Sequence, residues 1–249
     1  MSAQIEIAVT CVHYQQRLCW MLSSLLQQMG ECPSILFNVA YLVGDGTPTT
    51  RAVCSFFRNE GLNIKETLYT DTEILQYRGL VRNRQLAESD SECMLFADCD
   101  MTYHPDFFAD LWPKVVKIGD FTQCLSAYRV SLDKAYCRKY FNGLDEHKYP
   151  CIIDKAGDLS NWPIYAVWPA TGGGYFQMVK VKTMRDKFEG LYIPPSKCND
   201  WSWQRGQMAK SDRKFRERIG GFIPLVTKPQ YHLNHERDHE AGGHLTIQR

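Results

Sequence analysis

The stretch "MLFADCDMTYHP", residues 94–105, places two aspartates directly after a hydrophobic run. Its first four residues are apolar, which is typical of the end of a buried strand. Asp98 and Asp100 stand two positions apart, so their side chains point to the same side of an extended chain. Converging carboxylates beside a hydrophobic core are costly unless something compensates their charge, and they suit a hard cation such as Mg²⁺ or Mn²⁺. The aspartates and Pro105 also fit an ordinary turn, so this stretch alone leaves both a metal site and a turn open.

The residues before this stretch alternate between strand-like and helix-like patterns. The expected strands are residues 5–13, 35–46, 63–70 and 93–100, and the expected helices are residues 17–29, 50–61 and 79–89. This alternation predicts an α/β fold in which a mostly parallel sheet is flanked by helices. Ligands of such sheets bind beyond the carboxyl ends of the strands. We therefore expect the polar strand ends at residues 10–14, 44–47 and 98–100 to share one rim and to form a binding site.

The second half of the chain has a looser pattern. Residues from about 126 onward are rich in aromatic residues, proline and glycine, which predicts loops and short strands draped over one end of the sheet. No internal repeat or low-complexity linker interrupts the chain. We therefore expect one domain over residues 1–249, with a regular half at 1–125 and an irregular half at 126–249.

Composition limits the classes of partner. Lys and Arg number 29 and Asp and Glu number 28, so no overall basic field favours nucleic acid or a membrane surface. The ten cysteines include no Cys-x-x-Cys pair, which disfavours a structural zinc site and favours reduced, buried thiols. The N-terminus lacks the basic and apolar regions of a signal peptide, and no stretch approaches the length of a transmembrane helix. We therefore expect a cytoplasmic protein without a membrane anchor.

Eight segments of the sequence, taken in order, resemble the motifs of one enzyme family. They are TCVHY (10–14), GDGT (44–47), RNRQLAES (82–89), FADCDMTYHPDFF (96–108), TGGGYFQMVK (171–180), KFEGLY (187–192), NDWSWQRG (199–206) and YHLNH (231–235). Their order and spacing resemble the GT-A fold glycosyltransferases, particularly family 2 and its galactosyltransferase-like relatives. The resemblance covers nearly the whole chain. It implies a Rossmann-like GT-A domain whose first half binds a nucleotide sugar and whose second half binds the acceptor.

The resemblance implies a donor site built from the first half. Thr10, His13 and Asp45 would contact the nucleotide, and a carboxylate there can accept hydrogen bonds from a uracil N–H or a sugar hydroxyl. Arg82 would line the diphosphate, because its planar guanidinium suits a phosphate. Asp98 would hold the ribose or the water shell of a metal ion.

The resemblance also implies a divalent cation, Mn²⁺ or Mg²⁺. Asp98 and Asp100 would bind it, and His232 or His235 would supply a further ligand. Such a cation would bridge the diphosphate of the donor and stabilise the departing nucleoside diphosphate.

The acceptor side is implied to lie in the second half. Asp200 matches the catalytic base, which would deprotonate an acceptor hydroxyl and give direct displacement with inversion. Gly173, Gly174, Trp201 and Trp203 would line the acceptor. The implied acceptor is a glycan, with a protein or a modified nucleic-acid base as alternatives.

Together these assignments predict a metal-dependent, inverting transfer of a sugar from a UDP-linked or similar nucleotide sugar to a hydroxyl. Departures from the family pattern are Asn199 in place of a first acid, Gly44 before Asp45, and the missing second glycine after Phe188. Two other functions stay open: metal-dependent nucleotidyl or phosphoryl transfer, and nucleotide-sugar binding without catalysis. Simpler roles also stay open for single residues, such as a solvated helix position for Arg82.

Overall fold

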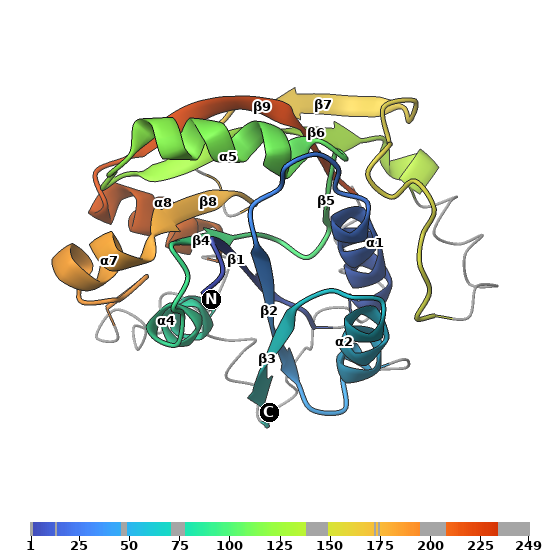
Figure 1. Ribbon diagram of the computed structural model, residues 1–249, viewed down its shortest axis with the longest axis horizontal. Coiled ribbons are helices and arrows are strands. Elements are labelled where there is room, and N and C mark those ends of the chain that lie inside the picture. Colours follow the sequence, from blue (N-terminus) through green and yellow to red (C-terminus); the bar gives the residue numbers. More distant parts are fainter. Residues whose placement is uncertain are drawn as a thin grey trace.

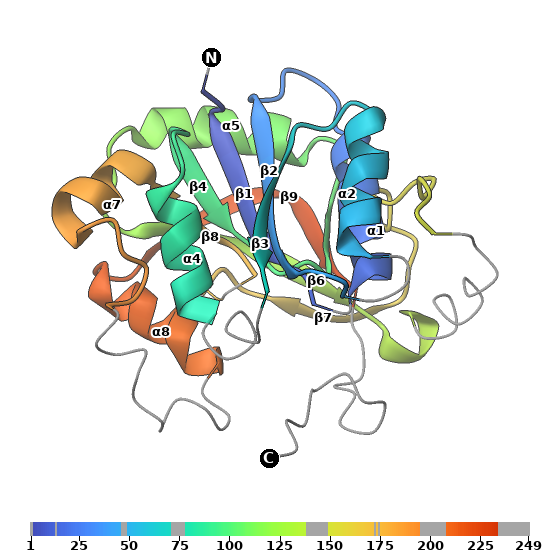
Figure 2. The same ribbon diagram turned by 90° about the horizontal axis from the view of Figure 1, so that it is seen from below.

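The computed structural model describes residues 2–12, 14–45, 49–70, 78–137, 149–171, 173, 175–194 and 208–233. These residues form a nine-stranded sheet with helices on both faces (Figures 1 and 2). The strands are β1 (Ile5–Thr10), β2 (Ile35–Leu42), β3 (Ile64–Tyr69), β4 (Cys93–Phe96), β5 (Met101–Tyr103), β6 (Cys124–Leu132), β7 (Ile164–Trp168), β8 (Gln177–Lys180) and β9 (Phe222–His232). The helices are α1 (Gln15–Leu26), α2 (Thr50–Asn59), α4 (Arg78–Ala87), α5 (Phe107–Ile118), α7 (Val181–Phe188) and α8 (Met208–Arg218).

The first half of the sheet is parallel and confirms the predicted α/β class. The strand order begins β3-β2-β1-β4, and all three neighbouring pairs are parallel. β1 and β2, in the middle of this set, are mostly buried, including the polar residues Glu6 and Asn38, which suits strands covered on both faces. Because the four strands run the same way, their carboxyl ends lie at one edge of the sheet. Thr10 pairs with Ala40 and Ala8 pairs with Phe96 just before that edge.

The second half of the chain is more regular than the sequence indicates. β6 has nine residues and β9 has eleven, and the two strands pair in parallel. β8 joins β4 to β6 by antiparallel pairing, β5 pairs antiparallel with β9, and β7 pairs antiparallel with β6. Pro224 and Pro229 lie inside β9. Proline has no N–H to donate to a neighbouring strand, so these two residues disfavour a strand here. The strand forms because it pairs with β6.

Two hydrophobic clusters fix the helices to the two faces. One holds the sheet against α1, α2 and α5 through residues such as Leu22, Phe57 and Leu111, all fully buried. The other holds α4, α7 and α8 through Leu86, Met184 and Phe215. Burying a side chain of this size contributes about 1.5–3 kcal/mol, so both helix layers are firmly held.

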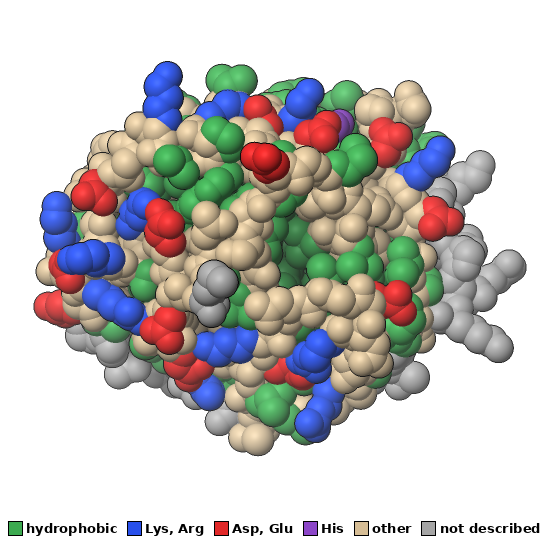
Figure 3. All heavy atoms as spheres, in the orientation of Figure 1, with side chains coloured by type: hydrophobic (Ala, Val, Ile, Leu, Met, Phe, Trp, Pro, Cys, Tyr) green, Lys and Arg blue, Asp and Glu red, His purple; other side chains and the backbone are tan. Residues whose placement is uncertain are grey.

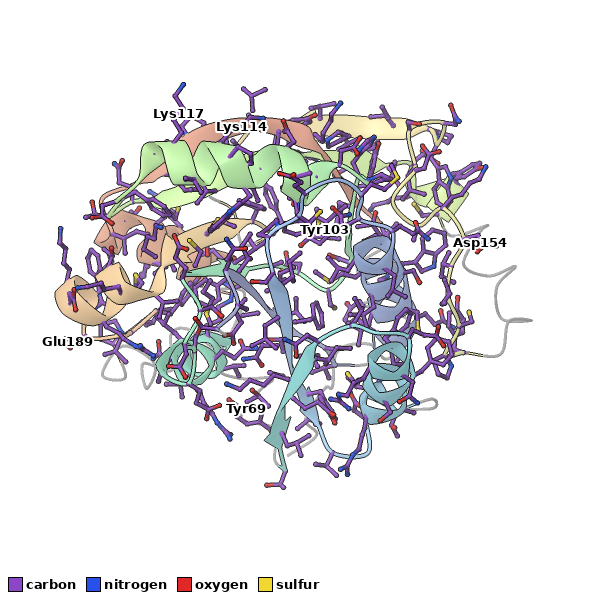
Figure 4. All side chains as sticks on the ribbon, in the orientation of Figure 1. Tyr69, Tyr103, Lys114, Lys117, Asp154 and Glu189 are labelled. Atoms are coloured by element: carbon purple, nitrogen blue, oxygen red, sulfur yellow. The ribbon has the colours of Figure 1, made fainter. Side chains whose placement is uncertain are left out.

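The exterior agrees with the balanced composition. On the face in Figure 3, Lys and Arg side chains are interspersed with Asp and Glu side chains, and no one sign dominates. Lys114 and Lys117 project outward from α5, whereas Tyr103 of β5 lies in the interior (Figure 4). Seven of the nine cysteines in the described ranges are buried, in keeping with the predicted buried thiols. None of the described helices is long and apolar enough to span a membrane.

Candidate active site

The Asp98–Asp100 stretch is a turn that also carries both carboxylates to the edge of the sheet. It follows the buried end of β4 and leads directly into β5, and the amide of Met101 donates to the carbonyl of Asp98 at 3.3 Å. Asp98 is partly exposed, whereas Asp100 is only 9% exposed. The sequence left open whether this stretch is a turn or a metal site. In the structure it is a turn that presents carboxylates at the sheet edge, so the two interpretations are compatible.

Strand pairing brings His232 to Asp100. Met101 lies opposite His232 in the β5–β9 pair, and the amide of Leu233 donates to the carbonyl of Asp100 at 2.9 Å. The His232 Nε2 atom lies 3.3 Å from Asp100 Oδ2, and its Nδ1 atom lies 3.5 Å from Ser131 Oγ on β6. These two contacts fix the ring orientation, and a hydrogen bond from Nδ1, such as that near Ser131, is how a ligand histidine is usually oriented when Nε2 faces the metal.

The predicted metal ligands are therefore partly placed. Asp100 and His232 are adjacent, Asp98 lies on the same turn, and His235 lies outside the described residues. Within the ranges that the structure describes, no group of three or more His, Cys, Asp or Glu side chains is arranged to hold a metal ion. The carboxylates suit Mg²⁺ or Mn²⁺, and an imidazole beside them is compatible with Mn²⁺, so a cation here would need further ligands from outside this set.

Tyr103 lies under the turn and is fully buried between α1 and α5 residues. Burial, together with the charges of Asp98 and Asp100, raises the pKa of its phenol. Its hydroxyl has no hydrogen-bond partner among the described residues. The phenol is thus neutral beside the two carboxylates and adds no negative charge to the site.

The predicted nucleotide residues lie at the ends of the parallel strands. Thr10 ends β1 and is partly exposed at the edge, and His13 lies outside the described residues. Asp45 is 4% exposed, and its carboxylate accepts from the Thr50 amide at 3.0 Å and from the Thr50 hydroxyl at 2.6 Å. Gln15 Nε2 donates to the Asp45 carbonyl. These contacts hold the loop after β2 against the first turns of α1 and α2, so the position of Asp45 is well defined.

Arg82 lies in a buried polar cluster on the α4 side of the sheet. It is 3% exposed, and its Nη1 atom donates at 2.5 Å to both Asp212 of α8 and the Tyr192 hydroxyl. The Tyr192 hydroxyl in turn donates to Gln177 of β8 at 2.6 Å. Burial lowers the pKa of the guanidinium, but Tyr192, Asp212 and Asp98 together raise it above its usual value. Arg82 is therefore a structural cation close to the turn, and its contact with a diphosphate stays a prediction.

The predicted acceptor residues are mostly outside the part of the chain that the structure describes. This holds for Gly174, Asp200, Trp201 and Trp203. Gly173 is described, and a Cβ atom there would lie 2.6 Å from Cε1 of Tyr175. A larger residue at position 173 would therefore displace the Tyr175 ring.

Several neighbours of the site have no signal in the sequence. Gln15, Ser131 and Asp212 contact predicted site residues, but each lies 30 or more positions from its partner. Only the strand register and the packing of α1 and α8 bring them into contact.

Comparison with solved structures places the architecture among known folds. The chain resembles S. aureus TarS with a TM-score of 0.59 and 14% identity, over 93% of this chain and 36% of the TarS chain. It resembles the mannosyltransferase PcManGT from Pyrobaculum calidifontis with a TM-score of 0.57 and 13% identity, over 96% of this chain and 59% of that chain. The chain has a GT-A-like fold.

The GT-A fold confirms the predicted architecture and leaves the substrates to be argued from the site, because folds of this kind host many functions. A TarS fragment, residues 1–349, has been determined with UDP-GlcNAc, and PcManGT with GDP-Man and Mn²⁺. The chain spans about 60% of that TarS fragment and 36% of the longer TarS chain. No family model and no curated protein sequence matches the chain.

Proposed function

We propose that this protein transfers a sugar from a nucleotide sugar, UDP-linked, to an acceptor hydroxyl. The observation that carries the proposal is the contact of Asp100 with His232 at the carboxyl edge of a GT-A sheet. Ligands of parallel sheets bind at this edge. Two proteins of the same fold were determined with nucleotide sugars, which supports the same class of donor here.

A divalent cation, Mn²⁺ or Mg²⁺, would be held by Asp100 and His232, which are in contact. Asp98, on the same turn, and His235 are the candidates for further ligands. The cation would neutralise charge on the donor diphosphate as the glycosidic bond breaks. Asp100 is held for this role, because its carbonyl and its Oδ2 atom are both fixed by the end of β9.

Residues of the chain would position the two substrates. Asp45 and Thr10 would contact the nucleotide at the ends of β2 and β1, opposite the second half of the sheet. An acceptor hydroxyl would be deprotonated by Asp200 as it attacks the anomeric carbon from the side opposite the leaving group. Attack from that side would invert the anomeric configuration.

A screen of donor hydrolysis tests the proposed function. Purified protein is incubated with UDP-GlcNAc, other UDP-sugars and GDP-mannose, with and without Mn²⁺, and the products are separated. We expect slow release of free sugar and nucleoside diphosphate from one donor, dependent on the cation. Release of pyrophosphate would instead indicate nucleotidyl transfer, and an absence of both binding and hydrolysis of every donor would overturn the proposal.

Replacing Asp200 with asparagine is expected to separate binding from chemistry. The amide keeps the size of the side chain but cannot accept the proton, so transfer falls by about a hundredfold or more. Donor binding and metal binding stay near those of the wild type. Transfer assays paired with titration of the nucleoside diphosphate measure the two effects, and wild-type transfer rates would remove Asp200 as the base.

A further inference from the structure

Arg129 of β6 is a half-buried cation that contacts no acidic side chain in the part of the chain that the structure describes. Its Nε atom is buried and has no hydrogen-bond partner, and its guanidinium has no ion pair among the described residues. Arg58, Arg82 and Arg213, in contrast, each contact a carboxylate at 2.5–2.7 Å. A buried N–H group without an acceptor, such as this Nε, is costly unless a ligand accepts from it.

Two aromatic rings hold Arg129 in place. Its guanidinium carbon lies 4.4 Å from the centre of the Tyr175 ring and 5.8 Å from the centre of the Trp168 ring. Both separations are within the range of cation–π contacts. The Tyr175 hydroxyl donates to the Pro169 carbonyl at 3.0 Å, and Gly173 leaves room for the Tyr175 ring. The cation is therefore held by the two aromatic rings and not by an ion pair with a described residue.

The register of the sheet places Arg129 next to the candidate active site. Arg129 pairs with Gln230 of β9, and Ser131 pairs with His232 two positions later in the same unbroken ladder. Residues two apart on a strand share one face and lie about 7 Å apart. Ser131 Oγ is 3.5 Å from the Nδ1 atom of His232, so Ser131 faces the Asp100–His232 pair. Arg129 therefore lies on the same face of the sheet, two residues before Ser131 along β6.

The strand beyond Arg129 adds an exposed aromatic surface. β7 pairs with β6 only, among the strands described, and Trp168 lies opposite Arg129 and is 46% exposed. An indole ring can pack against the apolar face of a sugar. A guanidinium can bind a carboxylate or a phosphate through two parallel hydrogen bonds. The pair therefore combines a sugar platform with an anion-binding group.

Arg129 lies on the side of the sheet away from the expected nucleotide. β4 and β8 lie between β1 and β6 in the sheet. The distance from β1 to β6 is therefore three strand spacings, or about 14 Å. The expected nucleotide contacts, Thr10 and Asp45, follow β1 and β2. A ligand of Arg129 and Trp168 would therefore meet the site from the acceptor side.

We propose that Arg129 and Trp168 form an acceptor subsite that recognises an anionic sugar, one that carries a carboxylate or a phosphate near the hydroxyl to be glycosylated. This inference rests on the proposed function and names its acceptor class. The guanidinium binds the anion, and the indole of Trp168 packs against the ring that bears it.

Binding of matched sugars tests the subsite without an acceptor reaction. The probes are methyl β-glucuronide, glucose 6-phosphate, methyl β-glucoside and inorganic phosphate, titrated by NMR into protein saturated with UDP and Mn²⁺. We expect the two acidic sugars to bind about tenfold more tightly than the neutral glucoside, a difference of about 1.4 kcal/mol. The better of the two acidic sugars distinguishes a carboxylate from a phosphate as the group recognised.

Variants connect this preference to the two residues. Arg129→Gln is expected to remove the preference for acidic sugars while UDP affinity stays within about twofold of the wild type. Trp168→Ala is expected to weaken all three sugars together. Arg213→Gln, which removes an exposed arginine of α8, is the matched control and changes neither result. Circular dichroism and thermal melting confirm that each variant is folded.

The outcomes separate this inference from the proposed function. Binding of UDP together with equal or absent binding of acidic and neutral sugars would overturn the subsite and leave the proposed function intact. Loss of UDP affinity in Arg129→Gln would move the residue to the donor site and overturn the acceptor assignment. Phosphate bound as tightly as glucose 6-phosphate would also overturn it, because no sugar is then recognised.

Discussion

Replacing Asp100 with alanine is expected to abolish cation-dependent turnover of the donor while the fold stays intact. Asp100 is the carboxylate in contact with His232, so its loss removes a hard ligand and the partner that orients the imidazole. A bound divalent cation supplies several kcal/mol of charge stabilisation, and about 2.7 kcal/mol corresponds to a hundredfold in rate. We therefore expect donor hydrolysis to fall by about a hundredfold or more, measured with saturating Mn²⁺.

The control for this variant is Asp106→Ala. Asp106 lies six positions later, its side chain is 45% exposed, and it makes no side-chain cap contact with α5. Hydrolysis and Mn²⁺ dependence of this control should match those of the wild type. Activity near the wild-type level in Asp100→Ala, with Mn²⁺ present, would remove the metal assignment.

Replacing Arg82 with methionine is expected to cause the largest loss of stability. The change leaves Asp212 without its cation at a position where its side chain is only 14% exposed. Breaking a buried ion pair by removing one partner costs about 3–5 kcal/mol. For a chain of this size the melting temperature should fall by about 10 °C, which thermal melting followed by circular dichroism measures.

Two further variants show whether the buried pair is responsible. Arg84→Met removes an exposed arginine on the same helix, paired with Glu88 at 2.9 Å, and should cost less than about 0.5 kcal/mol. Adding Asp212→Leu to Arg82→Met should recover part of the lost stability, because no buried charge is then left unpaired. A stable Arg82→Met variant with weakened UDP binding would instead place the main role of Arg82 at the diphosphate.

The fold class could be predicted from local patterns. The apolar runs of β1, β2 and β4 and the helical spacing of α1 and α2 are properties of neighbouring residues, so they are visible before any tertiary contact forms. β9 could not be predicted, because its two prolines oppose a strand and only pairing with β6 and β5 stabilises it.

The candidate site divides in the same way. Asp98 and Asp100 stand out because carboxylates directly after a buried strand require compensation. The compensation is not local: His232 is 132 positions from Asp100 along the chain. Even Glu6, inside the first strand, is fully buried and accepts hydrogen bonds from Asn38 and Ser89, which no pattern near Glu6 indicates.

The sequence by itself therefore determined the α/β class, the shared edge of the parallel strands and the two carboxylates at that edge. The contacts of the site residues are visible only in the folded structure: His232 contacts Asp100, Asp212 contacts Arg82, and two aromatic rings contact Arg129. The two differ because they depend on interactions over different separations along the chain. Hydrophobic periodicity is a property of neighbouring residues, whereas strand register and helix packing join residues between 39 and 132 positions apart, and these contacts exist only in the folded chain.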